Sequence, residues 1–221
     1  FITRHLYNFF VADEPQVPAW DIEEPRDPEA INMMSKTLVD NDYDIKSVLR
    51  AMFNSDFFKE AQHQKVKSPV EIVVGTLRRT GDLIGSDPKL EALAKEPGYM
   101  GQDILDPPSV EGWHTGREWI NSGSLVKRVN FVSDRVSDTG LPGVRRMVEH
   151  VGNNGSTMSA EELVDRCLDI MGPVDVSDST KSELVSHVET GGDIELGGES
   201  FSRRASETFA LIAATREYQF G

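Results

Sequence analysis

The segment YMGQDILDPPSVEGWHTGREWI, which runs from Tyr99 to Ile120, is the most unusual part of the chain and the starting point for predicting its fold. It contains two of the three tryptophans. The adjacent prolines Pro107 and Pro108 remove two backbone donors, so a helix does not pass through them. Because much of this loop is apolar, we expect Trp113 and Trp119 to anchor it to a helical body.

The residues on both sides of this loop follow the periodicity of helices. Ser68–Glu71 reads as an N-cap, a proline and a glutamate in the positions of a capping box, and Gly81 ends the helix that they begin. Asp27-Pro28 and Asp44 mark earlier helix starts, and Ser159–Glu162 forms a second capping box. Alternation with a period of two is nearly absent. The predicted fold class is all-α, an irregular multi-helix bundle with a long loop anchored by proline and tryptophan.

Glycine and proline give two candidate boundaries within the chain. We assign residues 1–138 to a helical core that includes the Trp-Pro loop, and residues 139–221 to a C-terminal helical subdomain packed on it. This division precedes the break at Gly140–Gly143, and the exposed turn Gly152–Gly155 is the best candidate for a boundary between subdomains. The Gly- and acid-rich residues 190–200 are expected to be mobile.

The composition excludes several classes of partner. Lys and Arg total 23 and Asp and Glu total 37, which gives a formal net charge of −14 without an acidic tail. Over most of the surface this charge repels nucleic acid and anionic membrane. No stretch approaches the roughly 20 apolar residues of a membrane span. Cys167 is the single cysteine, so it forms no internal disulfide, and its helical spacing predicts a buried side chain.

The loop also holds the densest group of chemically useful side chains. We select eight residues as ligand-binding candidates: Asp103, Asp106, Glu111, Trp113, His114, Arg117, Glu118 and Trp119. Mixed carboxylates and a histidine suit a hard or borderline metal. Two carboxylates with an arginine suit sugar recognition or acid–base chemistry, and the tryptophans suit stacking on a sugar or an apolar ligand. In the purely structural alternative these residues cap turns, anchor the loop and cover the surface. No His-x-x-x-His spacing is present, so we assign no metal site.

The rest of the chain has no motif of a known chemistry. It contains no Gly-x-Ser-x-Gly elbow, no phosphate-binding loop with a following lysine and no dinucleotide fingerprint, so the catalytic residues and any cofactor are unknown. His5, His63, His150 and His187 are scattered among the predicted helices. We expect each of them at the surface or half-buried.

Four stretches resemble the C-terminal half of the bacterial "domain of unknown function 1800" family. They are Arg4–Val11, Asp44–Phe58, Lys67–Glu71 with its following helix, and Met100–Ile120. The last two are the most specific, because Met-Gly-Gln followed by Asp-Pro-Pro-x-Val-x-Gly-Trp is long and unusual. The resemblance covers residues 1 to about 132 and the closing Glu217–Gln219, with only a helical pattern between them.

The resemblance implies an exported protein of bacterial origin that is longer than this chain. The implied location is extracytoplasmic: periplasmic, cell-surface or secreted. The implied partners are a missing N-terminal half of the same protein and possibly the product of a neighbouring gene. No activity is implied. His114 stands where relatives have a proline after the tryptophan, which argues against a family-wide catalytic role for it.

Two hypotheses of function follow from these patterns. In the first, the chain is an exported helical module, the C-terminal part of a larger protein, that serves non-catalytic assembly or partner or ligand binding. In the alternative it is a hydrolase of a carbohydrate or of a phosphate or sulfate ester. The active site of that hydrolase is shared with the missing N-terminal half.

Overall fold

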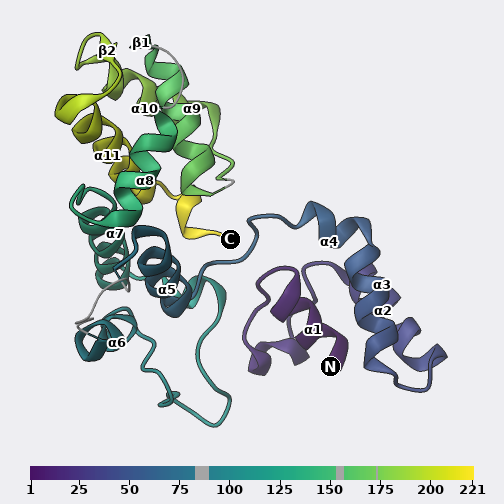
Figure 1. Ribbon diagram of the computed structural model, residues 1–221. Coiled ribbons are helices and arrows are strands. Elements are labelled where there is room, and N and C mark those ends of the chain that lie inside the picture. Colours follow the sequence, from purple (N-terminus) through teal and green to yellow (C-terminus); the bar gives the residue numbers. More distant parts are fainter. Residues whose placement is uncertain (83–89, 153–156, 173) are drawn as a thin grey trace.

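The protein is predominantly helical, as the sequence predicts. The computed structural model describes residues 1–82, 90–152, 157–172 and 174–221. These residues contain eleven α-helices, which Figure 1 shows as two separate groups. The helices are α1 (Ile2–Phe10), α2 (Pro28–Asp40), α3 (Ile45–Asn54), α4 (Asp56–Glu60), α5 (Pro69–Thr80), α6 (Leu90–Tyr99), α7 (Ser122–Val136), α8 (Pro142–Val151), α9 (Ala160–Met171), α10 (Asp178–Glu189) and α11 (Gly198–Ala214). Three short 3₁₀-helices lie at Val17–Asp21, Gly116–Trp119 and Glu217–Gln219.

Helices α1 to α4 form the first group, which we call the N-terminal unit (residues 1–61). Their apolar faces meet in a hydrophobic cluster of its own, centred on Met34, Val48 and Met52. Each of these three side chains is fully buried. Phe57 and Phe58 of α4 fold back against this cluster, as their position after a polar helix end predicts.

A buried ion pair fixes the acidic connector that joins α1 to α2. Arg4 of α1 donates from Nε to Glu14 Oε2 at 2.7 Å, and both side chains are almost inaccessible to solvent. The same guanidinium donates to the carbonyl oxygens of Glu23 and Glu24, and it lies 4.7 Å from the ring centroid of Trp20. Pairing of a buried charge offsets its desolvation, so these contacts hold the connector against α1.

Helices α5 to α11 form the second group, the main unit (residues 66–221). One hydrophobic cluster runs through it and includes Val136 and Val144, which lie on either side of the predicted boundary at residue 138. That boundary stays a prediction. Cys167 belongs to this cluster and is fully buried, as predicted, and burial raises the pKa of its thiol.

The main unit also contains a two-stranded antiparallel sheet that the sequence analysis missed. Strands β1 (Thr157–Met158) and β2 (Ile194–Glu195) each have two residues, too few to show a period of two. Strand β2 lies in the segment 190–200. Arg204 of α11 donates to the carbonyl oxygens of Gly191 and Gly192 in this segment, and its predicted mobility stays a prediction.

The predicted caps at Asp27, Asp44 and Ser68 are confirmed, whereas the capping box predicted at Ser159–Glu162 is only half-formed, because Glu162 pairs with Arg166. Asp27 accepts from the amide of Ala30, and Asp44 accepts from the amides at the start of α3. Ser68 and Glu71 form the full capping box of α5, which ends at Gly81 with a φ of 76°. Asp87-Pro88 has the same N-cap and proline pattern of a helix start, but it lies outside the described residues, as do residues 153–155 of the predicted turn.

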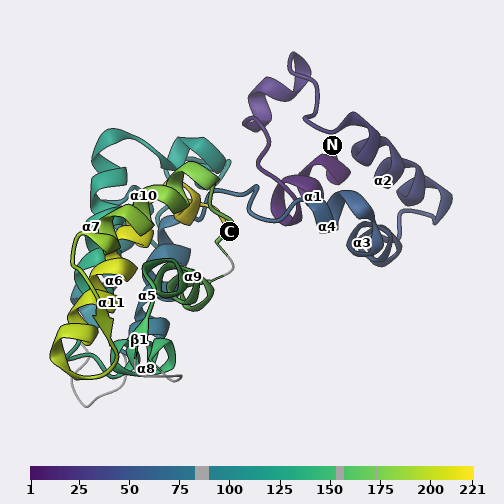
Figure 2. The same cartoon turned by 90° about the horizontal axis from the view of Figure 1, so that it is seen from above.

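The C-terminal residues hold the linker between the two units. Lys67 donates its amide to the carbonyl of Gln219 at 2.9 Å, and Val66 forms a β-bridge with Phe220. Arg128 of α7, which is fully buried, donates from Nε to Gln219 Oε1 at 2.9 Å. We call residues 65–67 together with residues 218–221 the clasp. Figures 1 and 2 both show the C-terminus beside the linker, between the two units.

Candidate functional site

The predicted loop is far more exposed than its composition indicates. Figure 1 shows the segment between α6 and α7 extending away from the helices. Leu105 is 89% exposed, with a φ of 69°, and Val110 is completely exposed. Trp119 is buried and anchors the end of the loop, as predicted. Trp113 is only half-buried, and its indole donates to the carbonyl of Asp103 at 3.1 Å within the loop itself.

The predicted polar residues of the loop do not form a closed site. Asp103, Asp106 and Glu111 are all exposed. His114 Nδ1 lies 2.6 Å from Glu118 Oε2, and both side chains are about half-exposed. Among residues 1–82, 90–152, 157–172 and 174–221, no group of three or more His, Cys, Asp or Glu side chains is placed to hold a metal ion. A ligand-binding role for these residues stays a prediction.

Arg117 differs from its neighbours because it faces a cleft between the two units. This cleft has a volume of about 380 Å³. Its basic side chains come from four distant parts of the chain: the arginines Arg26, Arg117 and Arg216, and His63. Its acidic lining consists of Asp13, Asp175 and Glu217. Val66 and Phe220, which belong to the clasp, also line the cleft.

Asp13 sits at the base of this cleft and is 4% exposed. Its Oδ2 accepts from the amide of Val66 at 2.8 Å, so it ties the connector to the clasp. Burial raises the pKa of Asp13, against the opposing effects of that hydrogen bond, Lys65 and Arg26. Gly116 has a φ of 60°, and a Cβ there would lie 2.9 Å from the Cβ of Asp13, so this close approach requires glycine.

Glu217 also has its own partners inside the protein. Its Oε1 accepts from Thr180 Oγ1 at 3.0 Å and from the amide of Ser177 at 3.4 Å. Burial opposes ionisation of Glu217, but these hydrogen bonds and its own backbone outweigh burial, and the pKa falls below its usual value. Two of the three acids are thus already satisfied by protein donors.

The three arginines of the cleft have no such partners. Among the described residues, Arg26, Arg117 and Arg216 form no side-chain hydrogen bond or ion pair, and all three are exposed to solvent. By contrast, Arg4, Arg135 and Arg166 each pair with a carboxylate. A guanidinium presents five donors in a planar fork that matches a carboxylate, phosphate or sulfate. The cleft therefore has the chemistry of an anion site.

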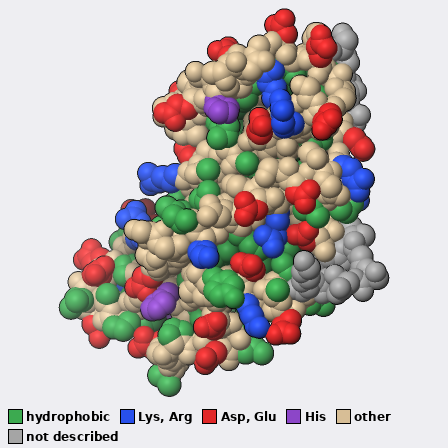
Figure 3. Space-filling model, turned by 90° about the vertical axis from the view of Figure 1, so that its left-hand side faces the viewer, with side chains coloured by type: hydrophobic (Ala, Val, Ile, Leu, Met, Phe, Trp, Pro, Cys, Tyr) green, Lys and Arg blue, Asp and Glu red, His purple; other side chains and the backbone are tan. Residues whose placement is uncertain are grey.

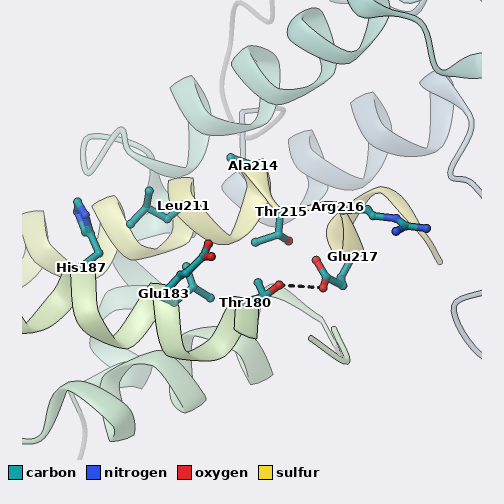
Figure 4. A pocket seen from close by; sticks show the side chains of 9 residues that line it. Thr180, Glu183, His187, Leu211, Ala214, Thr215, Arg216 and Glu217 are labelled. Carbon is teal, nitrogen blue, oxygen red and sulfur yellow. Dashed lines mark hydrogen bonds between the residues drawn. The ribbon is translucent and has the colours of Figure 1, made fainter. Parts of the chain in front are cut away.

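An open groove of about 590 Å³ adjoins the cleft. It lies between α10 and the end of α11, and it shares Arg216 and Glu217 with the cleft. Figure 4 shows the line of side chains along it, from His187 to the hydrogen bond between Thr180 and Glu217. Leu184, Leu211 and Ala214 give the groove an apolar component, and Glu183 is its other acid.

The sequence analysis missed most of the cleft. Arg26 lies in the acidic connector, His63 in the linker before the clasp, and Arg216 after the last helix. No spacing along the sequence relates these positions, because the fold of the chain alone brings them together. His63 has a φ of 58°, a left-handed conformation that a sequence does not reveal for histidine.

The remaining surface has mixed character. Figure 3 shows acidic and basic side chains scattered over one face, with hydrophobic side chains more frequent in its lower half. That half is at the level of α6 and the exposed loop in Figure 1. In the part of the chain that the structure describes, no helix combines the length and the apolar character needed to cross a membrane.

Comparison with known proteins identifies a family and nothing beyond it. A family model described as "Protein of unknown function (DUF1800)" matches residues 1–220. The match includes residues 133–216, where the sequence analysis found only a helical pattern. No curated protein and no solved structure gives a significant match.

Proposed function

The chain belongs to the DUF1800 family, and from this premise we propose that it is a binding module whose cleft takes up an anionic group of a ligand or partner. The anion is a carboxylate, phosphate or sulfate, held by the arginines that line the cleft. This proposal gives the predicted binding function a place and a chemical class.

One observation carries the proposal. Arg26, Arg117 and Arg216 line one cleft without an acidic partner among the described residues, although the chain carries a net charge of −14. Carboxylates are plentiful in so acidic a protein, yet these three arginines lie around one cleft without an ion pair to any of them. An incoming anion supplies the charge-assisted hydrogen bonds that these arginines lack.

Two acids of the cleft already have hydrogen-bond donors within the protein. Asp13 is engaged by the amide of Val66, and burial favours its uncharged form. Glu217 is engaged by Thr180 and Ser177. Asp175 is exposed and is the third acid of the lining.

The hydrolase alternative gains no support from the described residues. Asp103, Asp106 and Glu111 lie on the exposed loop and do not line the cleft. The loop carboxylates therefore bring no general acid, base or nucleophile to the cleft. We therefore favour binding over catalysis.

Titration with small anions tests the proposal. Sulfate and glutarate, added to the whole chain at constant ionic strength with chloride as the reference, should give saturable binding by calorimetry. The double variant Arg117→Gln, Arg216→Gln should bind at least roughly tenfold more weakly, since hydrogen bonds to charged groups contribute about 1.5–3 kcal/mol. Arg146→Gln is the matched control, because Arg146 is an exposed arginine on α8 that does not line the cleft. Binding that is absent, or equal in all three proteins, contradicts the proposal.

Two further proposals rest on the family resemblance alone. They are an extracytoplasmic location and a partner encoded by a neighbouring gene. Fractionation of the native host with an antibody against the chain tests the location, and recovery in the cytoplasmic fraction would contradict it.

A further inference from the structure

The most exposed segment of the protein and its cleft have complementary chemistry. The segment is the loop 103–111, with the sequence DILDPPSVE. Its carboxylates are Asp103, Asp106 and Glu111, and all are exposed. The loop extends away from the helices of the main unit (Figure 1), and none of its residues lines the cleft of its own chain.

The apolar residues of this loop have no cover within the described structure. Ile104 is 48% exposed, Leu105 is 89% exposed and Val110 is completely exposed. Pro107 and Pro108 restrict the backbone between Leu105 and Val110. An isolated β-bridge joins Ser109 to Gly112. Because the prolines lower the conformational freedom that the free loop has to lose, such a segment binds with a smaller entropic cost than a flexible one.

The cleft offers basic side chains for the carboxylates of the loop, and the adjoining groove offers apolar side chains for its leucine. Arginines line the cleft, and the groove that adjoins it at Arg216 contains the apolar side chains Leu184 and Leu211. An extended segment that carries an acid beside a leucine, as Leu105-Asp106 does, places its carboxylate at Arg216 and its apolar side chain in the groove. Complementary charge of this kind selects partners and fixes their register.

We propose that the loop 103–111 of one chain docks into the cleft and groove of a second copy, with Asp106 at Arg216. This inference rests on the proposed function, because the loop then supplies the anionic group. Since every copy carries both the loop and the cleft, a reciprocal exchange closes at a dimer, whereas a one-way contact continues along a row of copies.

Charge reversal on each side of the contact tests the inference. Sedimentation of the whole chain from about 10 μM to about 300 μM should show association that weakens in Asp106→Arg and in Arg216→Glu. We expect a loss of roughly tenfold or more in the association constant for each variant. The double variant Asp106→Arg, Arg216→Glu should restore association, because the pair is then re-formed with its charges exchanged. Arg146→Glu, on an exposed face of α8, is the matched control and should behave as the wild type.

The apolar part of the contact has its own variant. Leu105→Ser leaves every charge in place and removes an exposed side chain, so it should weaken association without affecting sulfate binding. A wild-type chain that stays monomeric over the whole concentration range overturns the inference. So does association that persists in Arg216→Glu, or a double variant that fails to restore it.

The outcomes separate the two proposals. Saturable sulfate binding by a monomeric chain overturns the self-docking inference alone and leaves an acidic segment of another protein as the occupant. Absence of sulfate binding contradicts the proposed function itself. Self-association that sulfate disperses, with the expected pattern of variants, supports both.

Discussion

At the scale of single residues, the least expected feature is a buried arginine with two partly buried cations beside it. Arg128 is fully buried, and its Nη1 has no hydrogen-bond partner among the described residues. The charges of Arg128 and Arg79 both act on Lys67. Glu71 is the acid whose charge acts on both Lys67 and Arg128. Burial lowers the pKa of Arg128 to about 10, against the opposing charge of Glu71. In the folded state, the positive charges of Arg79 and Arg128 therefore repel that of Lys67.

Because Lys67 can lose its proton, its lowered pKa makes the free energy of unfolding depend on pH. Burial, followed by the charges of Arg79 and Arg128, lowers the pKa of Lys67 from 10.5 to about 8. Below pH 8 both the folded and the unfolded chain carry this proton, and the full penalty applies. Between pH 8 and about 10 the unfolded chain keeps the proton that the folded chain has released, so the free energy of unfolding rises with pH.

Urea denaturation at pH 7, 8, 9 and 10 measures this effect. We expect the wild type to gain up to about 3 kcal/mol over this range, since one pKa unit corresponds to about 1.4 kcal/mol. Lys67→Met should flatten the rise, and Lys95→Met, at an exposed position on α6, should not. Tyr218 acts in the opposite direction at higher pH, because burial raises its pKa, so the range ends near pH 10. A rise that is equal in all three proteins would exclude Lys67 as its source.

At the scale of elements, two predicted capping boxes prove to be different. In α5, Ser68 accepts from the amide of Glu71, and Glu71 accepts in return from the amide of Ser68 at 2.7 Å. In α9, Ser159 accepts from the amide of Glu162, but Glu162 instead pairs with Arg166 at 2.6 Å. The second box is therefore only half-formed.

Double-mutant cycles should separate these two caps. Ser68→Ala and Ser159→Ala should each lower the free energy of unfolding by about 1 kcal/mol, because each leaves a helix amide without its acceptor. Combined with Glu71→Ala, the first should show a coupling energy of about 0.5 kcal/mol or more. Combined with Glu162→Ala, the second should be additive within about 0.3 kcal/mol. Equal coupling in both cycles would mean that the geometry of the two caps is the same in solution.

These elements also show what a sequence can predict. Helix starts at Asp27, Asp44 and Ser68 were predictable because a cap depends on residues within one turn. Helix α6 continues to Tyr99 although Pro97 lies within it, because a proline near the end of a helix removes few bonds. Only Arg117 of the cleft was predicted as a site residue. Its neighbours there come from positions as distant as Arg26 and Arg216, and a pattern of local spacing does not join them.

At the scale of the whole molecule, two hydrophobic clusters are joined through the clasp. The cluster of the N-terminal unit ends at residue 61 and that of the main unit begins at Ile72. Between them the clasp supplies backbone pairing to the linker, and Asp13 attaches the connector to it through the amide of Val66. Because the cleft is lined from both units and from the clasp, its shape depends on this junction.

Gln219 is the side chain on which the junction depends most. It is 4% exposed, its Oε1 accepts from Arg128 Nε at 2.9 Å, and its carbonyl accepts from the amide of Lys67. Gln219→Ala leaves a second donor of a fully buried guanidinium without a partner, which should lower the free energy of unfolding by about 2–3 kcal/mol. Gln62→Ala, at an exposed position, should change it by less than about 0.5 kcal/mol.

The same variant should loosen the arrangement of the two units. Because Arg128 no longer holds residue 219, the amides of Val66 and Lys67 should exchange with solvent faster than in the wild type, while core amides of α2 and α3 keep their protection. Small-angle scattering should then give a larger radius of gyration, and sulfate binding should weaken because the cleft has lost its fixed shape. Destabilisation without any change in exchange at Val66 and Lys67 would show that Gln219 supports only the main unit. The linker would then be held by Asp13 and the backbone bridge to Phe220 alone.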